Sequence, residues 1–421
     1  MPRLTPLLLN AVLATGLGLS TAAHCDDLDA LALQTEPAVQ NSGDTTLRLA
    51  LELALGRIDQ RDRVDSTNLR RASLDLRYAG RLTDRWRLSF SDRIDHTHPV
   101  LGDQPKTVNS LREAYLGWQA DAGSVAVDFG RINHRQGPAF GYNPTDYFRR
   151  GGLRTVTTAD PVALREMRMG AVMLRANQLL AEGGVTLALA PKLESRSSRD
   201  PASLDLGATN ATNRAVLSHD VRFSERISGQ GSLLLEQDGS RFGASVTALA
   251  TDSLVAYAEW SYGKTPNLLD QVLATSKPAI RAHQTAFGMT YTLPGSLALT
   301  VEAESNGAGL DRNGWNSVLS QGATAYQRYL ELTQTSQELG SRRAWLLYAS
   351  KKGLITNQLD LTAFVRTNAI DHSRLVWTEL RYHWSRFDAA LQWQRSWGDP
   401  GTEFDVLPYR KVIQLVAVFY M

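Results

Sequence analysis

The chain has 421 residues, a formal net charge of +2 and a mean hydropathy of −0.25, with 43% hydrophobic residues. No apolar run approaches the roughly 20 residues of a membrane-spanning helix, and the balanced charge gives no basis for nucleic-acid binding. These values are compatible with a transmembrane β-barrel, because alternating apolar and polar residues give such a barrel an unremarkable mean hydropathy.

The N-terminus predicts export. Arg3 precedes the apolar stretch Leu7 to Leu19, and small residues follow at 21–23, so residues 1–23 have the pattern of a secretory signal peptide. The single cysteine, Cys25, follows His24 rather than the small residue of a lipoprotein cleavage site. We therefore expect no lipid anchor and no internal disulfide, and residues 24–44 are predicted to be a flexible periplasmic leader.

The first predicted strand is the stretch Leu47 to Arg57, "LRLALELALGR", which has leucine at every second position from 47 to 55. On a helix these leucines would be scattered around the axis, whereas on a strand they line one face. The opposite face carries Arg48 and Glu52. Such a contrast requires the leucines to meet either a protein core or lipid.

The same alternation recurs along the whole chain. It is found near 73–78, 85–91, 113–119, 125–129, 166–177 (a weaker case), 185–189, 217–223, 229–237, 241–250, 253–263, 281–292, 296–305, 342–351, 357–367, 373–384, 387–397 and 411–420. Most of these segments are long enough for a tilted membrane strand of about 9–11 residues, and soluble sheets usually have shorter strands.

The links between these segments mostly alternate between short and long, which is typical of a bacterial outer-membrane barrel with periplasmic turns and external loops. We therefore predict an all-β fold: a closed antiparallel transmembrane barrel of about 18 strands over residues 45–421, with both termini in the periplasm. The segment 325–339 is assigned to a helical or irregular part of a long loop. The aromatic final strand, "VIQLVAVFYM", resembles the signal that the barrel-assembly machinery reads, although Met421 follows the aromatic Tyr420.

Residues 111–148, "LREAYLGWQADAGSVAVDFGRINHRQGPAFGYNPTDYF", resemble a strand–turn–strand–loop block of porin-like and alginate-export-like outer-membrane proteins. In those proteins a "REAYLGW"-type strand and a "DFGR"-type strand precede a loop with an "NPTD"-like element. The resemblance implies passage of a polar or anionic solute across the outer membrane of a Gram-negative cell. It assigns no individual binding residue.

If the apolar faces meet lipid, the opposite faces line the lumen. The predicted pore-lining residues on the first strands are Arg48, Arg71, Arg77, Arg85, Arg87, Arg93 and Glu113. The arginine guanidinium pairs well with carboxylate or phosphate, which favours anionic solutes. The alternative is that these charges only pair with one another across strands.

The segment 134–165 is longer than ordinary loops, and its aromatic, glycine and arginine content argues against disorder. We predict that it folds into the barrel and narrows the pore, with Arg149, Arg150 and Arg154 at the constriction. The alternative is a rigid external lid that packs on neighbouring loops.

No recognisable catalytic spacing or metal-ligand cluster is found in the sequence, so we expect a non-enzymatic protein without cofactors. The predicted function is passive diffusion of polar, anionic solutes or an anionic polysaccharide through an arginine-rich lumen, by a monomer or trimer surrounded by outer-membrane lipid. The alternatives are a substrate-specific uptake porin, a non-conducting barrel that acts as scaffold or adhesin, and a soluble β-rich protein whose leucines are buried under a second sheet.

Overall fold

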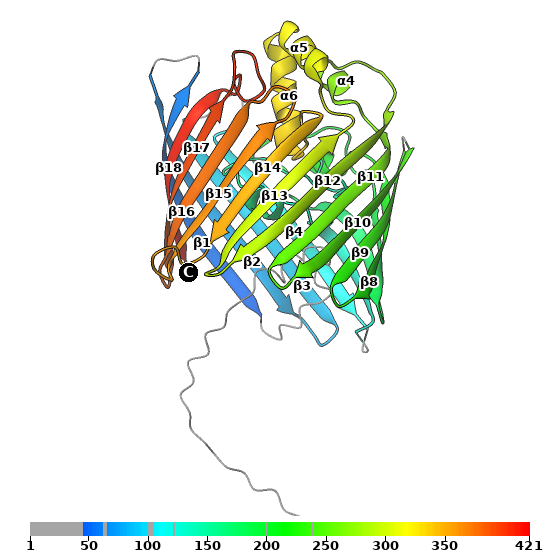
Figure 1. The fold of residues 1–421 in the computed structure, drawn as a ribbon. Helices are drawn as coiled ribbons and strands as arrows, with labels where there is room; N and C mark the ends of the chain where they lie inside the picture. Colours follow the sequence, from blue (N-terminus) through cyan, green and yellow to red (C-terminus); the bar gives the residue numbers. More distant parts are fainter. Residues whose placement is uncertain (1–44, 62–64, 100–104, 121–122, 199, 238) are drawn as a thin grey trace, which may run out of the picture.

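The structure is a computed structural model that describes residues 45–61, 65–99, 105–120, 123–198, 200–237 and 239–421. The predicted signal peptide (1–23) and leader (24–44) lie outside the described residues. Most of the described chain is β-strand, and the strands form one continuous sheet (Figure 1).

Eighteen antiparallel strands follow one another in chain order. They are β1 (Thr46–Gln60), β2 (Thr67–Arg81), β3 (Trp86–His98), β4 (Thr107–Gln119), β5 (Val125–Ile132), β6 (Ala171–Leu180), β7 (Gly183–Ala190), β8 (Arg214–Ser224), β9 (Ile227–Glu236), β10 (Gly239–Thr251), β11 (Leu254–Thr265), β12 (Ile280–Leu293), β13 (Leu297–Asn306), β14 (Arg343–Lys351), β15 (Leu359–Asn368), β16 (Arg374–His383), β17 (Phe387–Trp397) and β18 (Tyr409–Tyr420).

The sheet closes on itself because β1 pairs with β18 as well as with β2. Leu53 is opposite Ala72 of β2 on one side and opposite Ala417 of β18 on the other. Closure leaves no edge strand with unpaired backbone groups, which is the condition for crossing lipid with strands. The predicted fold class and strand number are confirmed.

The leucine face of β1 points away from the barrel. Leu47 and Leu55 are 65% and 60% exposed, whereas Ala54 and Ile58 on the other face are 1% and 2% exposed. All eighteen strands belong to a single sheet, so no second layer among the described residues covers the leucines. This arrangement contradicts the soluble alternative and identifies the leucine face as the lipid-facing surface.

The long loops lie at one end of the barrel, which we call the long-loop rim, and short turns lie at the other (Figure 1). Three helices lie at this rim: α4 (Leu268–Val272), α5 (Arg312–Ser320) and α6 (Ala323–Thr335). They pack together through Val272, Trp315 and Tyr329, so the segment expected to be helical or irregular is mainly helix α6. Among the described residues, no helix combines the length and the apolar character needed to cross a bilayer.

The weak strand expected at 166–177 begins later than predicted. Residues Pro161–Met167 form helix α2, and β6 starts only at Ala171. The helix begins here because Asp160 accepts a hydrogen bond from the Val162 amide and Pro161 occupies the first helical turn. A further helix, the short α3 (Leu206–Thr209), lies between β7 and β8.

Substitution of Leu391, which is 51% exposed on the outer face of β17, tests this assignment of faces. We expect L391R to reduce the free energy of unfolding in lipid vesicles by about 2–4 kcal/mol, because an arginine near the bilayer midplane must be desolvated. Q394R is the matched control, since Gln394 lies on the inner face of the same strand. Equal losses in both variants would contradict the assignment.

Candidate functional site

The loop between β5 and β6, residues 133–170, turns into the barrel and is fixed to the inner wall at several points. Its first anchor is Glu302 on β13, which is fully buried. The Glu302 carboxylate accepts hydrogen bonds from the amides of Phe140 (2.8 Å), Gly141 (3.0 Å) and Tyr142 (3.1 Å), and from the Tyr257 hydroxyl (2.7 Å). One buried carboxyl group therefore fixes three successive backbone amides of the loop.

A second carboxylate, that of Glu259 on β11, anchors the next part of the loop. It accepts hydrogen bonds from the Ala139 amide (2.8 Å), the Asn143 side-chain amide (3.1 Å) and the Thr145 hydroxyl (3.0 Å). Gly137 has a φ of +85°, and a Cβ atom there would lie 2.2 Å from a Glu259 oxygen. Only glycine therefore fits at this approach.

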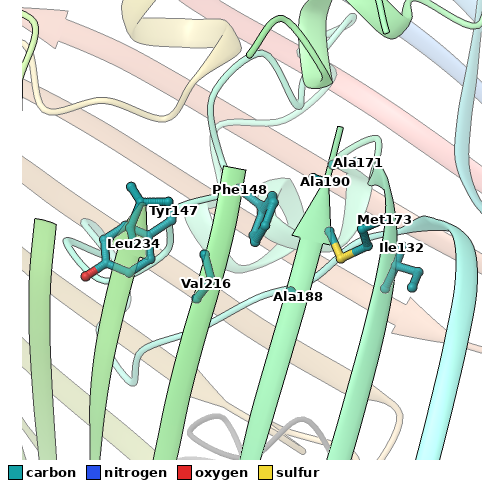
Figure 2. Close-up of a cluster of buried hydrophobic side chains, with 9 residues drawn as sticks. All are labelled: Ile132, Tyr147, Phe148, Ala171, Met173, Ala188, Ala190, Val216 and Leu234. Carbon is teal, nitrogen blue, oxygen red and sulfur yellow. The ribbon is translucent and has the colours of Figure 1, made fainter. Parts of the chain in front are cut away.

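The loop also packs on an apolar patch of the inner wall. Figure 2 shows Tyr147 and Phe148 of the loop beside buried residues that come from five adjacent strands. These residues are Ile132 (β5), Ala171 and Met173 (β6), Ala188 and Ala190 (β7), Val216 (β8) and Leu234 (β9). The inner face is apolar here because the loop covers it.

A second loop, residues 307–342 between β13 and β14, meets the first one inside the barrel. Glu338 accepts hydrogen bonds from Arg149 (2.7 Å), from the Tyr142 hydroxyl (3.0 Å) and from Asn306 (3.0 Å). Burial alone would lower the pKa of Arg149, but the adjacent Glu338 carboxylate raises it above its ordinary value. Two loops thus meet inside the barrel, and only the first was predicted from the sequence.

Most of the predicted lumen arginines lie on the inner face and are paired with acids. Glu52 of β1 accepts hydrogen bonds from Arg71 (2.7 Å) and Arg93 (2.9 Å), and Arg93 also bonds Asp95 (2.9 Å). In a second group, Arg87 bonds Asp128 (2.9 Å). These contacts agree with the alternative interpretation, in which the charged residues of the lumen pair with one another across strands.

The remaining predicted residues on the first strands have different surroundings. Arg48 is exposed near the short-turn end, directly opposite Arg77 of β2. Arg77 bonds Asp75 at 3.3 Å. Arg85 lies in the turn before β3 rather than on a strand, and Glu113 lies on the inner face of β4 opposite Ser91.

The three loop arginines also separate into two kinds. Arg149 is buried and donates to Glu338, as described above. The Arg154 guanidinium donates to the carbonyls of Asn109 (2.8 Å) and Ser203 (2.7 Å), so it ties the loop to the rim. Arg150 is exposed, and within the described part of the chain its guanidinium has no hydrogen bond or ion pair.

Two inner-wall arginines that the sequence analysis did not single out lie near Arg150. Arg214 of β8 and Arg241 of β10 both face inward, and Arg241 is among the charged neighbours of Arg150. The Arg214 guanidinium lies 4.8 Å from the Phe148 ring centroid and that of Arg241 lies 5.4 Å from the Tyr147 centroid. The alternation of residues on β8 and β10 could have predicted that both arginines face the lumen. Their proximity to Arg150 could not be predicted, because the three residues are far apart in the sequence.

No family model and no curated protein sequence matches this chain. Solved structures do match. Pseudomonas aeruginosa OccK8 (OprE) has a TM-score of 0.55 and 10% identity, with 90% of this chain and 98% of that chain covered. P. aeruginosa OpdK, solved with vanillate, gives the same TM-score, identity and coverages, and Acinetobacter baumannii OccAB1 differs only in that 96% of its chain is covered.

These similar structures are outer-membrane porins with closed 18-strand barrels. The expected likeness to porins is therefore confirmed for the fold, whereas the likeness to alginate-export proteins stays a prediction. A closed barrel of this form with a lipid-facing apolar surface belongs in the outer membrane.

Substitution of Glu302 by alanine tests the anchoring of the loop. We expect amide hydrogen exchange at residues 140–142 to become roughly tenfold to a hundredfold faster, because three backbone hydrogen bonds lose their acceptor. D388A is the control, since Asp388 bonds His383 and Tyr420 rather than this loop. Unchanged exchange in E302A would show that the loop is held by other contacts.

The carboxyl group of Asp160 introduces a pH dependence. Burial raises its pKa from 3.8 to about 6, although the Val162 amide bond opposes this shift. The folded protein therefore binds a proton that the unfolded chain has released in the window from about pH 4 to pH 6, and stability falls as the pH rises through this window.

We expect D160N to show a smaller loss of thermal stability between pH 4.5 and pH 7 than the unsubstituted protein. Asparagine has no titrating group but still caps a helix, so the start of α2 is preserved. The measurement is the unfolding midpoint by circular dichroism at both pH values. Identical pH dependence in the two proteins would rule out Asp160 as the source.

Proposed function

We propose that this protein is an outer-membrane uptake porin that admits small anionic solutes by passive diffusion. The observation that carries the proposal is the exposed guanidinium of Arg150, which lies on the loop inside the lumen and has no hydrogen bond or ion pair among the described residues. Arg214 and Arg241 lie near it, where Arg214 donates to the Tyr147 carbonyl (3.1 Å) and Arg241 pairs with Glu236 (3.4 Å).

The contacts of the acidic residues in the lumen support a pore that prefers anions. Glu259 and Glu302 are fully buried and their carboxyl oxygens accept hydrogen bonds from the loop, so these acids are not available to a solute. The Arg150 guanidinium has Glu236 and Glu338 among its charged neighbours but makes no hydrogen bond or ion pair with any described residue. An anion that passes the constriction therefore meets an available guanidinium fork, which binds carboxylate in a bidentate manner.

Aromatic rings beside the arginines favour a small carboxylate over a polysaccharide. Tyr147 and Phe148 lie against Arg241 and Arg214 and present apolar surface next to the positive charge. The similar structure of OpdK with vanillate is consistent with such a solute. Two loops that meet inside the lumen also leave less room for a polymer, which favours uptake of small solutes over alginate export.

Planar-bilayer recording of R150Q tests the proposal. We expect the preference for chloride over potassium, measured as a reversal potential in a salt gradient, to decrease. The vanillate concentration that blocks half of the current should rise roughly tenfold, because a charge-assisted hydrogen bond is lost.

The control is R374Q, which removes an equal charge from the outer face of β16, outside the lumen. Benzyl alcohol serves as an uncharged aromatic comparison. A protein that conducts no ions would favour the scaffold or adhesin alternative. Equal block of both variants by vanillate would place anion recognition elsewhere.

A further inference from the structure

Two basic side chains lie directly opposite each other on the outer surface of the barrel. Lys264 of β11 is paired in register with Arg281 of β12, and both are exposed. Their strand neighbours Gly263, Thr265 and Ala282 are buried on the inner side. Both charges therefore point outward, away from the lumen that carries the proposed porin function.

This pair is electrostatically unfavourable on its own. Like charges directly opposite on neighbouring strands destabilise a sheet. Within the part of the chain that the structure describes, neither side chain has an acidic partner or a hydrogen bond. An anion bound between them would relieve the repulsion and would be held by both charges.

The surroundings of the pair indicate where that anion comes from. Both residues lie within two positions of a strand end at the long-loop rim. Next to them, Trp260, Tyr262 and His283 form an aromatic cluster in which the Tyr262 and His283 ring centroids are 4.4 Å apart. Tryptophan and tyrosine gather where a membrane protein meets the headgroup region.

Further along β12, the outer face becomes strongly apolar. Phe287 and Met289 are each 54% exposed there. The order along the strand is therefore charge, aromatic cluster and apolar belt, which matches the order phosphate, headgroup and acyl chain in a lipid leaflet.

His283 provides a further polar contact beside the pair. The Trp260 indole N–H, which can only donate, donates to His283 Nδ1 at 3.1 Å. The proton of a neutral His283 ring is then on Nε2, which is a donor. Lysine, arginine and this imidazole N–H together are suited to phosphate oxygens.

Other basic residues face outward near the same rim. They are Arg57, Arg70, Arg343, Arg374, Arg395 and Lys411. Arg395 and Lys411 are also directly opposite each other, but Asp59 is opposite Lys411 on its other side. The pair on β11 and β12 has no such acid in register, so it is the best-defined anion site in this band.

We propose that Lys264 and Arg281 bind the phosphate group of a phosphorylated lipid in the outer leaflet of the membrane, with His283 as an additional donor. This binding fixes the barrel in a layer of anionic lipid and is independent of the solute that passes through the lumen.

Native mass spectrometry of the detergent-purified protein with added bisphosphorylated lipid A tests the proposal. We expect K264Q/R281Q to bind at least roughly tenfold less tightly than the unsubstituted protein, because each basic residue near an anionic lipid surface contributes to the affinity. K264R/R281K should bind within about threefold of the unsubstituted protein, because both charges are kept.

The matched control is R226Q/R386Q, which removes two exposed charges from the short turns at the opposite rim. It should bind lipid A normally, and all variants should keep their heat-modifiable migration and their conductance. The proposal is overturned if K264Q/R281Q binds lipid A as the unsubstituted protein does, if R226Q/R386Q loses as much affinity, or if dephosphorylated lipid A binds equally well. Displacement of lipid A by millimolar inorganic phosphate would identify a free-anion site and would also overturn it.

Discussion

Backbone hydrogen bonding in lipid is the constraint on which the rest of this structure depends. Every strand N–H and C=O in the hydrocarbon layer needs a partner within the protein. The pairing of β1 with β18 satisfies this requirement for the two strands that would otherwise be edges. The inner and outer faces, the alternation of residues and the position of the lumen loop all follow from this closure.

Closure creates a lumen whose wall carries many charged side chains. The inner wall carries acids and arginines together, and the two kinds have different roles. Acids on β11 and β13 are used to hold the backbone of the loop 133–170, whereas Arg150 on that loop is left exposed. The buried acids on the inner wall thus have an architectural role, because they hold the loop in place.

The arrangement of strands was predictable from sequence because alternation is a local property. Five leucines at every second position determine which face of β1 meets lipid, without any knowledge of its partners. The strand number followed from repetition of this pattern, and the alternation of short and long links indicated the two ends of the barrel. The late start of β6 was missed because a proline and a capping aspartate start a short helix there.

The candidate site was only partly predictable because its contacts are not local. The length and composition of 134–165 indicated an inward loop, but its anchors Glu259 and Glu302 lie on distant strands. Sequence alone also could not distinguish the roles of the three loop arginines. Arg149 and Arg154 make hydrogen bonds that hold the loop, whereas Arg150 is exposed. The apolar inner patch around Met173 and Leu234 contradicts the expectation of a polar lumen face, because the loop itself covers it.

The position of the two anchoring carboxylates has a consequence for biogenesis. Phe140 is separated from Glu302 by 162 residues along the chain, so the loop and its anchor on β13 come from distant parts of the sequence. The loop cannot take its final place until that strand is present. Placement of the loop within the lumen is therefore coupled to the incorporation of β13, because a barrel that lacks this strand has no Glu302 anchor for the amides of residues 140–142.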